Sequence, residues 1–228
     1  MNIFGCSSSP NTEQPIIQLI AVTQAESDSL NLTVLQKNWI KQQSFQAEPA
    51  STCVLPDSDG MIDKVLFGWR KSTSFWEFAR VFQQLPNGQY QIVQSDELRV
   101  DIAKLAKIWG LCCYDYTLYK TSKQSHPTLI VSQLSKKEQF HLNLVLNATY
   151  QVRSWINTPA EDFGPGDISD LCHALAKRHQ GKISQVVGDE LLEQNYPLIH
   201  LVGRASARAP RMLHLSWGNP KDPAIALI

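Results

Sequence analysis

The sequence predicts an α/β protein in two parts joined by one long helix. Short β-branched and aliphatic runs alternate with amphipathic helical stretches, as in a sheet that helices cover on both faces. Residues 135–156 form one helical stretch, which Asn157-Thr158-Pro159 ends because the residue before a proline leaves the helical region. The length of 228 residues suits one large domain, or one domain plus part of another. We expect an N-terminal domain over 1–134, a linker helix and joint over 135–159, and the incomplete start of a second α/β domain over 160–228.

The first part opens with segments that read as strands. The residues before Pro15 lack a periodic pattern, so we expect a disordered start. Apolar runs at 16–22, 30–35, 51–56 and 63–69 are separated by Pro, Asp, Ser and Gly, and they predict four strands.

Helices and strands then alternate. Phe75, Phe78 and Phe82 stand at helical spacing, and Pro86-Asn87-Gly88 stops that helix. A strand at 90–93, a helical stripe from Ile102 to Cys113 and a strand from Thr128 complete the first part. This alternation predicts the mixed sheet flanked by helices.

The linker helix has a well-marked start, because Ser135 and Glu138 have the spacing of a capping box. At about 100° per residue its apolar positions cover more than half the circumference. These positions are Phe140, Leu142, Leu144, Val145, Leu146, Ala148, Val152, Trp155 and Ile156. Such a helix is expected to be clamped between two packed bodies, with its apolar arc and His141 buried.

Beyond the joint, Pro165 suits the first residue of a helix that ends at His179-Gln180-Gly181. Strands are expected at 183–187 and 211–217, with a short helix through Leu191 and Leu192 between them. The run 224–228 reads as the start of a further strand. A parallel sheet pairs its central strands on both edges, so we expect 165–228 to be an incomplete body.

The charge and cysteine content argue against a nucleic-acid-binding protein and against a disulfide-bonded one. Lysine plus arginine equals aspartate plus glutamate at 21 each, so no overall basic field points to nucleic acid. The charged fraction of 18% is low, which favours a surface that faces another domain or subunit. Five cysteines without a C-x-x-C pair suit a reduced, cytoplasmic compartment. No apolar run is long enough to span a membrane.

Candidate chemistry is sparse. The six histidines lack metal-binding spacing, and neither a phosphate loop nor a G-x-S-x-G elbow is present, so we expect no catalytic or metal residue in this chain. Arg204, Arg208 and Arg211 could hold an anion such as a carboxylate, or could form a basic surface loop between two strands. Glu161 and Asp162 could act as an acid and base pair, or could be solvated carboxylates or cap the next helix.

The stretch R-S-W-I-N-T-P-A-E-D-F-G-P at 153–165 resembles the connection between the two domains of the leucyl aminopeptidase (cytosol aminopeptidase) family. P-L-I-H-L-V-G-R-A-S-A-R-A-P-R at 197–211 and L-S-W-G-N-P at 215–220 resemble the opening of the family's catalytic domain, in the same order. Trp155, Asn157, Thr158 and Pro159 would then form the interdomain linker. The N-T-P at 157–159 differs from the family's N-T-D metal motif, because proline replaces the ligand carboxylate.

The resemblance implies a macro-like N-terminal domain for assembly or regulation, followed by the truncated first part of an α/β metallopeptidase domain. The parent enzyme would be a cytoplasmic homo-hexamer that uses two divalent metals, zinc or manganese, to remove N-terminal amino acids from peptides. Its motifs G-K-G-x-x-F-D and N-T-D-A-E-G-R are absent from this sequence, so the chain alone is predicted to be inactive. Two alternatives stay open: a stand-alone macro-like ligand-binding module, and a DNA-binding role as in some bacterial relatives.

Overall fold

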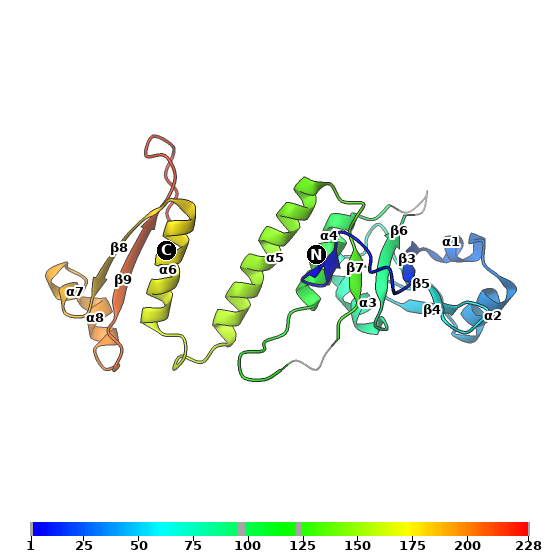
Figure 1. Cartoon of the computed structure of the whole chain (residues 1–228), viewed down its shortest axis with the longest axis horizontal. Helices are drawn as coiled ribbons and strands as arrows, with labels where there is room; N and C mark the ends of the chain where they lie inside the picture. Colours follow the sequence, from blue (N-terminus) through cyan, green and yellow to red (C-terminus); the bar gives the residue numbers. More distant parts are fainter. Residues whose placement is uncertain (1, 95–98, 122–124, 228) are drawn as a thin grey trace. The chain divides into compact units, whose positions relative to one another are not determined.

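The computed structural model describes residues 2–94, 99–121 and 125–227 (Figure 1). The chain divides into two compact units, residues 1–154 and 155–228, and each is described by itself. The long helix α5 (Lys136–Asn157) belongs mainly to the first unit and runs into the second.

The first unit is built on a seven-stranded mixed sheet. Its strands are β1 (Asn2–Ile3), β2 (Cys6–Ser7), β3 (Ile16–Val22), β4 (Thr52–Pro56), β5 (Ile62–Gly68), β6 (Gln89–Val93) and β7 (Thr128–Ile130). They lie in the order β1-β2-β7-β6-β3-β5-β4. The five central strands run parallel, whereas β1 and β4 pair antiparallel with β2 and β5 at the two edges. The predicted mixed α/β fold is confirmed.

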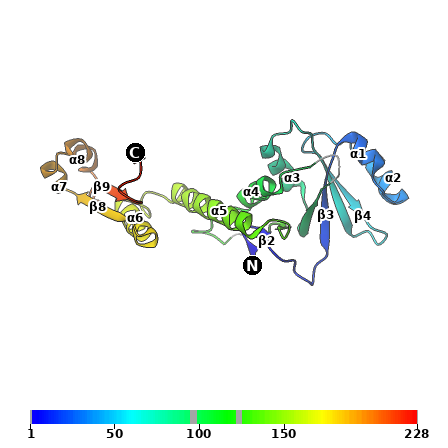
Figure 2. The same ribbon diagram turned by 90° about the horizontal axis from the view of Figure 1, so that it is seen from above.

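Helices cover both faces of this sheet. They are α1 (Gln24–Ser29), α2 (Val34–Gln42), η1 (Phe75–Glu77), α3 (Phe78–Gln84), α4 (Ile102–Cys112) and α5. Figure 2 shows α3 and α4 beside one face of the sheet and α1 and α2 on the other side. The predicted helices at 75–85 and 102–113 are confirmed.

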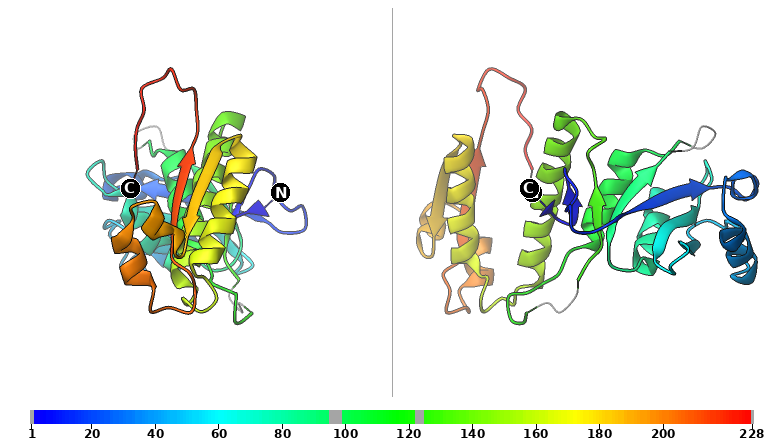
Figure 3. Two further views of the ribbon diagram at one scale, coloured as in Figure 1. Left: turned by 90° about the vertical axis from the view of Figure 1, so that its left-hand side faces the viewer. Right: turned by 45° about the vertical axis from the view of Figure 1, so that its right-hand side comes forward.

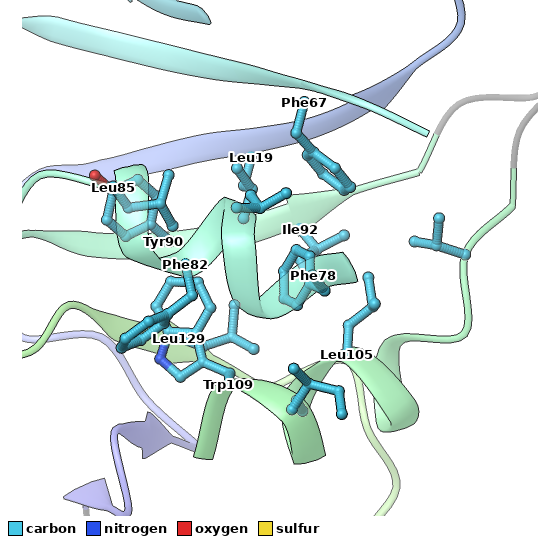
Figure 4. Packing of buried hydrophobic residues seen from close by; sticks show 14 of the residues in the cluster. Leu19, Phe67, Phe78, Phe82, Leu85, Tyr90, Ile92, Leu105, Trp109 and Leu129 are labelled. Carbon is cyan, nitrogen blue, oxygen red and sulfur yellow. The ribbon is translucent and has the colours of Figure 1, made fainter. Parts of the chain in front are cut away.

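The alternation of strand residues divides the core between the two faces. Leu19 and Phe67 point into the larger cluster, whereas their neighbours Ile20 and Leu66 point into the smaller one. A period of two is what the pleat of a strand imposes. Figure 4 shows how Phe78, Phe82, Tyr90 and Leu129 gather around Trp109 in the larger cluster. Trp109 is fully buried, and its Nε1 donates to the carbonyl of Pro127 at 3.1 Å.

The helix α5 packs on α4 through a close approach at Gly110. A Cβ at this position would overlap the side chain of Leu146 on α5, so a larger residue here would force that side chain or the helix to shift. The Tyr150 hydroxyl donates to the carbonyl of Gly110 at 2.6 Å. The predicted capping box is present, because Ser135 Oγ accepts from the Glu138 amide and the Glu138 carboxylate accepts from the Ser135 amide.

The first unit by itself covers part of the apolar arc of α5. Leu142 and Leu146 are buried, but Phe140, Leu144, Val152 and Ile156 are exposed. His141 is exposed on the first unit. Within that unit, α5 contacts α4 through Leu146 and Tyr150, and Tyr150 packs on Phe4 of the N-terminal hairpin. The burial of the remaining apolar positions between two bodies stays a prediction.

The second unit is a helix packed on a two-stranded sheet. It contains α6 (Pro165–His179), β8 (Lys182–Val187), α7 (Glu190–Glu193), α8 (Pro197–Gly203) and β9 (Arg211–Ser216). The strands β8 and β9 pair antiparallel, with α6 beside them (Figure 3). Among the described residues of this unit, Gly164, Ser169, Ala176 and Leu191 are the buried ones. The core is therefore thin.

Three predictions about elements are wrong. Residues 30–33 are not a strand and Val34 begins α2, because Thr33 and Gln36 form a capping box. The expected disordered start instead contains the β1–β2 hairpin, which pairs with β7 and packs Phe4 on Tyr150. Residues 224–227 form no strand, since no neighbouring strand pairs with them.

Candidate functional site

The predicted interdomain residues come together in a turn at the end of α5. Asn157 is the last residue of the helix, and the Thr158 amide donates to the carbonyl of Trp155 at 3.3 Å. The Pro159 carbonyl accepts from the amides of Asp162 and Phe163 at 2.9 and 3.0 Å. The chain thereby folds back, so that the rings of Phe163 and Trp155 stack with their centroids 6.1 Å apart. This turn, residues 157–164, is called the joint below.

Arg208, in the segment between α8 and β9, contacts the joint. Its guanidinium donates to the carbonyl of Ala160 at 2.7 Å and to that of Glu161. It also lies 4.0 Å from the carboxylate of Asp167, which accepts from the Gly164 amide at 2.8 Å and so caps α6. A Cβ at Gly164 would overlap the side chain of Arg208, so a larger residue here would force the guanidinium to move. The guanidinium therefore binds backbone oxygens and a carboxylate of the chain itself.

The other two arginines of the predicted anion contact differ from Arg208. Arg211 Nη1 lies 3.4 Å from Gln185 Oε1, an atom that also accepts from Ser169 Oγ at 2.8 Å. Arg204 is exposed and follows α8 directly. An anion contact for the three together stays a prediction.

Replacing Arg208 by methionine should loosen the joint. The change removes two hydrogen bonds from a charged donor, and because the side chain is partly exposed we expect a loss of only about 1 kcal/mol. Thermolysin should then cleave before Phe163 several times faster. Arg204→Met is the matched control, and thermolysin should cleave it at the same rate as the unaltered chain. Equal rates for Arg208→Met and the unaltered chain would show that Arg208 does not hold the joint.

A polar hollow lies where the loop before β3 crosses the starts of β6 and β7. Ser7, Ser9, Pro10, Asn11, Gln14, Gln89 and Thr128 line its volume of about 340 Å³. The side-chain amide of the buried Gln89 forms its hydrogen bonds within the protein. Its Oε1 accepts from the backbone N–H of Asn11, and its Nε2 donates to the carbonyls of Asn11 and Gln14. Ligand sites in open α/β sheets lie at the carboxyl ends of strands, whereas this hollow lies at the amino ends. The geometry favours a structural role for Gln89, which the sequence pattern did not reveal.

The thiols of the first unit are poorly suited to nucleophilic chemistry. Burial raises the pKa of Cys6 to about 12, with a further contribution from the neighbouring Cys113 thiol. Burial likewise raises the pKa of Cys53 to about 11 and that of Cys113 to about 12. Since the thiolate is the reactive form, these thiols stay protonated and inert near neutral pH.

The raised thiol pKa values predict a loss of stability in alkali. In the unfolded chain these thiols ionise near pH 9, whereas the folded chain keeps them protonated. The unfolded state thus binds fewer protons as pH rises through this window, and the free energy of unfolding falls. The urea midpoint at pH 10 should lie below that at pH 7.5.

Replacing Cys113 by alanine should make that drop smaller. Each midpoint is compared with that of the same variant at pH 7.5, so the cost of the substitution itself cancels. A drop of equal size in Cys113→Ala would assign the pH dependence to other groups.

Neither a metal cluster nor a membrane helix is found in the described parts of the chain. No three histidine, cysteine, aspartate or glutamate side chains converge there in a way that could hold a metal ion. The helices of residues 2–94, 99–121 and 125–227 also lack the combination of length and apolar character that crossing a bilayer requires.

Two family models match the chain, and together they cover both units. Residues 18–132 match the model described as M17 aminopeptidase, N-terminal domain. Residues 150–228 match the model described as cytosol aminopeptidase family, catalytic domain.

Individual proteins agree with these models. Peptidase B of Yersinia pestis (strain Pestoides F) is 35% identical over 109 residues, which are 44% of this chain and 25% of that protein. The crystal structure of a cytosol aminopeptidase from Coxiella burnetii matches 96% of this chain and 47% of its own, with a TM-score of 0.83 and 26% identity. A bottromycin maturation enzyme solved in complex with Mn shares the fold, with a TM-score of 0.67 and 20% identity over 90% of this chain and 45% of its own. The chain thus spans about a quarter of that curated relative and about half of each solved chain.

Proposed function

The chain belongs to the M17 (cytosol) aminopeptidase family, and from this premise we propose that the protein works in removing N-terminal amino acids from peptides. It carries the N-terminal domain of that family and the start of the catalytic domain. The observation that carries the proposal is that both family models match in order, the first ending before α5 and the second beginning within its last two turns.

Two divalent metals, zinc or manganese, would supply the chemistry by polarising the scissile carbonyl and holding the attacking hydroxide. The relative solved with Mn supports this for the family. The described residues of this chain offer no fitting set of ligands, so we derive no catalytic step from them. What they contribute is placement: the stacked Trp155 and Phe163 and the Arg208 contacts hold the start of α6 at a defined turn.

We also propose that the complete protein is a cytoplasmic homo-hexamer. The low charged fraction and the exposed apolar side chains support association. The description of the matched family as cytosol aminopeptidases supports the location. Sedimentation of the complete protein would test the assembly, and cell fractionation would test the location. A monomeric complete protein would overturn the assembly proposal.

The activity is tested by assay together with the coding sequence. Residues 1–228 should not hydrolyse leucine p-nitroanilide with added manganese or zinc. Translation beyond codon 228 should reveal a G-K-G-x-x-F-D run in frame, and the product of that longer frame should be active and lose activity to a chelator. Metal-dependent turnover by residues 1–228 alone would contradict our assignment of the ligands outside them. A longer frame with no such run, or with an inactive product, would overturn the proposed activity.

A further inference from the structure

The turn between α3 and β6 contains the one Asn-Gly pair of the sequence, Asn87-Gly88. Asn87 is exposed, and every contact of this turn that is used below lies within the first unit. In the part of the chain that the structure describes, neither the Asn87 carboxamide nor the Gly88 N–H forms a hydrogen bond. The side-chain carbon and the backbone nitrogen that would have to meet are therefore not held apart by other partners.

Glycine at position 88 favours a reaction between these two groups. Glycine has no side chain to shield its backbone nitrogen, and its backbone rotates readily. A Cβ at this position would lie 2.8 Å from Ile17 Cδ1, so the packing of the turn on β3 also favours glycine. Asn11 is exposed as well, but the β-branched Thr12 follows it and crowds its backbone nitrogen.

We propose that Asn87-Gly88 is a site of spontaneous deamidation. The Gly88 nitrogen gives up its proton to the solvent and attacks Asn87 Cγ, so that an N–Cγ bond forms and a succinimide ring closes. The Cγ–Nδ2 bond breaks, and the nitrogen takes a proton from the solvent and leaves as ammonia. Water then opens the ring at either carbonyl, which yields aspartate or isoaspartate. One water is consumed and one ammonia released in all, and no electrons are transferred.

The isoaspartate product disturbs the start of β6. Its main chain runs through Cγ, so one extra carbon atom stands between residues 87 and 88. The turn is fixed on both sides of this linkage, because the Gly88 carbonyl accepts from the Thr128 amide at 2.9 Å and the Pro86 carbonyl accepts from the Tyr90 hydroxyl at 2.7 Å. Since β6 lies between β7 and β3, an added backbone atom here strains the pairing on both of its edges. The first unit therefore loses stability as isoaspartate accumulates. This inference does not depend on the proposed peptidase activity.

Peptide mapping of incubated protein tests the site. Folded residues 1–228 are kept at pH 8.5 and 37 °C and digested with trypsin, and the peptide 81–99 is sequenced by electron-transfer mass spectrometry, which distinguishes aspartate from isoaspartate. Asn87 should convert about tenfold faster than Asn11, whose β-branched neighbour hinders ring closure. The reaction should be slower at pH 6.5, because the attacking nitrogen must lose its proton.

Asn87→Gln is the matched control for the site. It keeps a neutral carboxamide, but its longer side chain cannot close the same ring, so the mass of peptide 81–99 should stay unchanged over the same incubation. Conversion of Asn87 no faster than that of Asn11 would overturn the proposal.

Urea denaturation tests the effect on the sheet. The midpoint of the unaltered chain should fall as the isoaspartate fraction rises, whereas that of Asn87→Gln should stay constant. Freshly prepared Asn87→Asp carries the new charge without the extra backbone atom, and its midpoint should lie close to that of the fresh unaltered chain. An equal fall in Asn87→Gln, or a midpoint of fresh Asn87→Asp as low as that of the incubated chain, would contradict the proposed disturbance of β6.

Discussion

Replacing Trp109 by alanine should cost about 3–5 kcal/mol of unfolding free energy, the range for removing a large buried aromatic side chain. Trp109 is fully buried on α4, and its ring lies 5.1 Å from that of Phe82 and 5.7 Å from that of Tyr90. Its indole nitrogen also satisfies the Pro127 carbonyl, which leads into β7. The substitution therefore leaves a cavity between helix and sheet and an unpaired carbonyl in the core.

Urea denaturation followed by circular dichroism at 222 nm measures this loss without relying on tryptophan fluorescence. Trp76→Ala is the matched control, because Trp76 on η1 is 66% exposed. A surface substitution of this kind should change stability by no more than about 0.5 kcal/mol. Equal midpoints for Trp109→Ala and Trp76→Ala would mean that α4 is not part of the cooperative core.

Much of the first unit could be predicted because its signals are local. The alternation of Leu19 and Ile20 identifies β3, and the Ser135–Glu138 spacing marks the start of α5. The same kind of signal stands at Thr33–Gln36, where a capping box begins α2. The apolar side chains of residues 30–35 are typical of a strand, and the cap outweighs that pattern.

The N-terminal hairpin could not be predicted from local pattern. Phe4 and Gly5 both have positive φ, at 54° and 70°, which no periodicity reveals. The partner of β2 is β7, with Cys6 opposite Leu129, so the pairing depends on residues far apart in the chain. The role of Arg208 was missed for the same reason, since its partners Ala160 and Glu161 lie in the joint. Such contacts follow from the tertiary fold.

Amide hydrogen exchange should be much slower in the first unit than in the second. In the first unit β3, β5 and β6 lie inside the sheet, with one hydrophobic cluster on each face. We expect the sheet and helices of residues 16–132 to protect their amides as one cooperative unit. In the second unit the sheet has two strands, and the exposed fractions of Trp217 and Leu227 are 78% and 96%. A two-stranded sheet is marginal in water without further packing.

The amides of β8 and β9 should therefore exchange on the order of a thousand times faster than those of β3 and β5, a difference of about 4 kcal/mol in opening free energy. Both pairs of strands form backbone hydrogen bonds, so a difference in exchange rate would report the stability of each unit and not whether hydrogen bonds are present. Leu191→Ala, at a fully buried residue of the second unit, should speed exchange in β8 and β9 and leave β3 unchanged. Equal protection of the two units would show that residues 165–228 fold unaided, and the view of them as an incomplete catalytic domain would then be wrong.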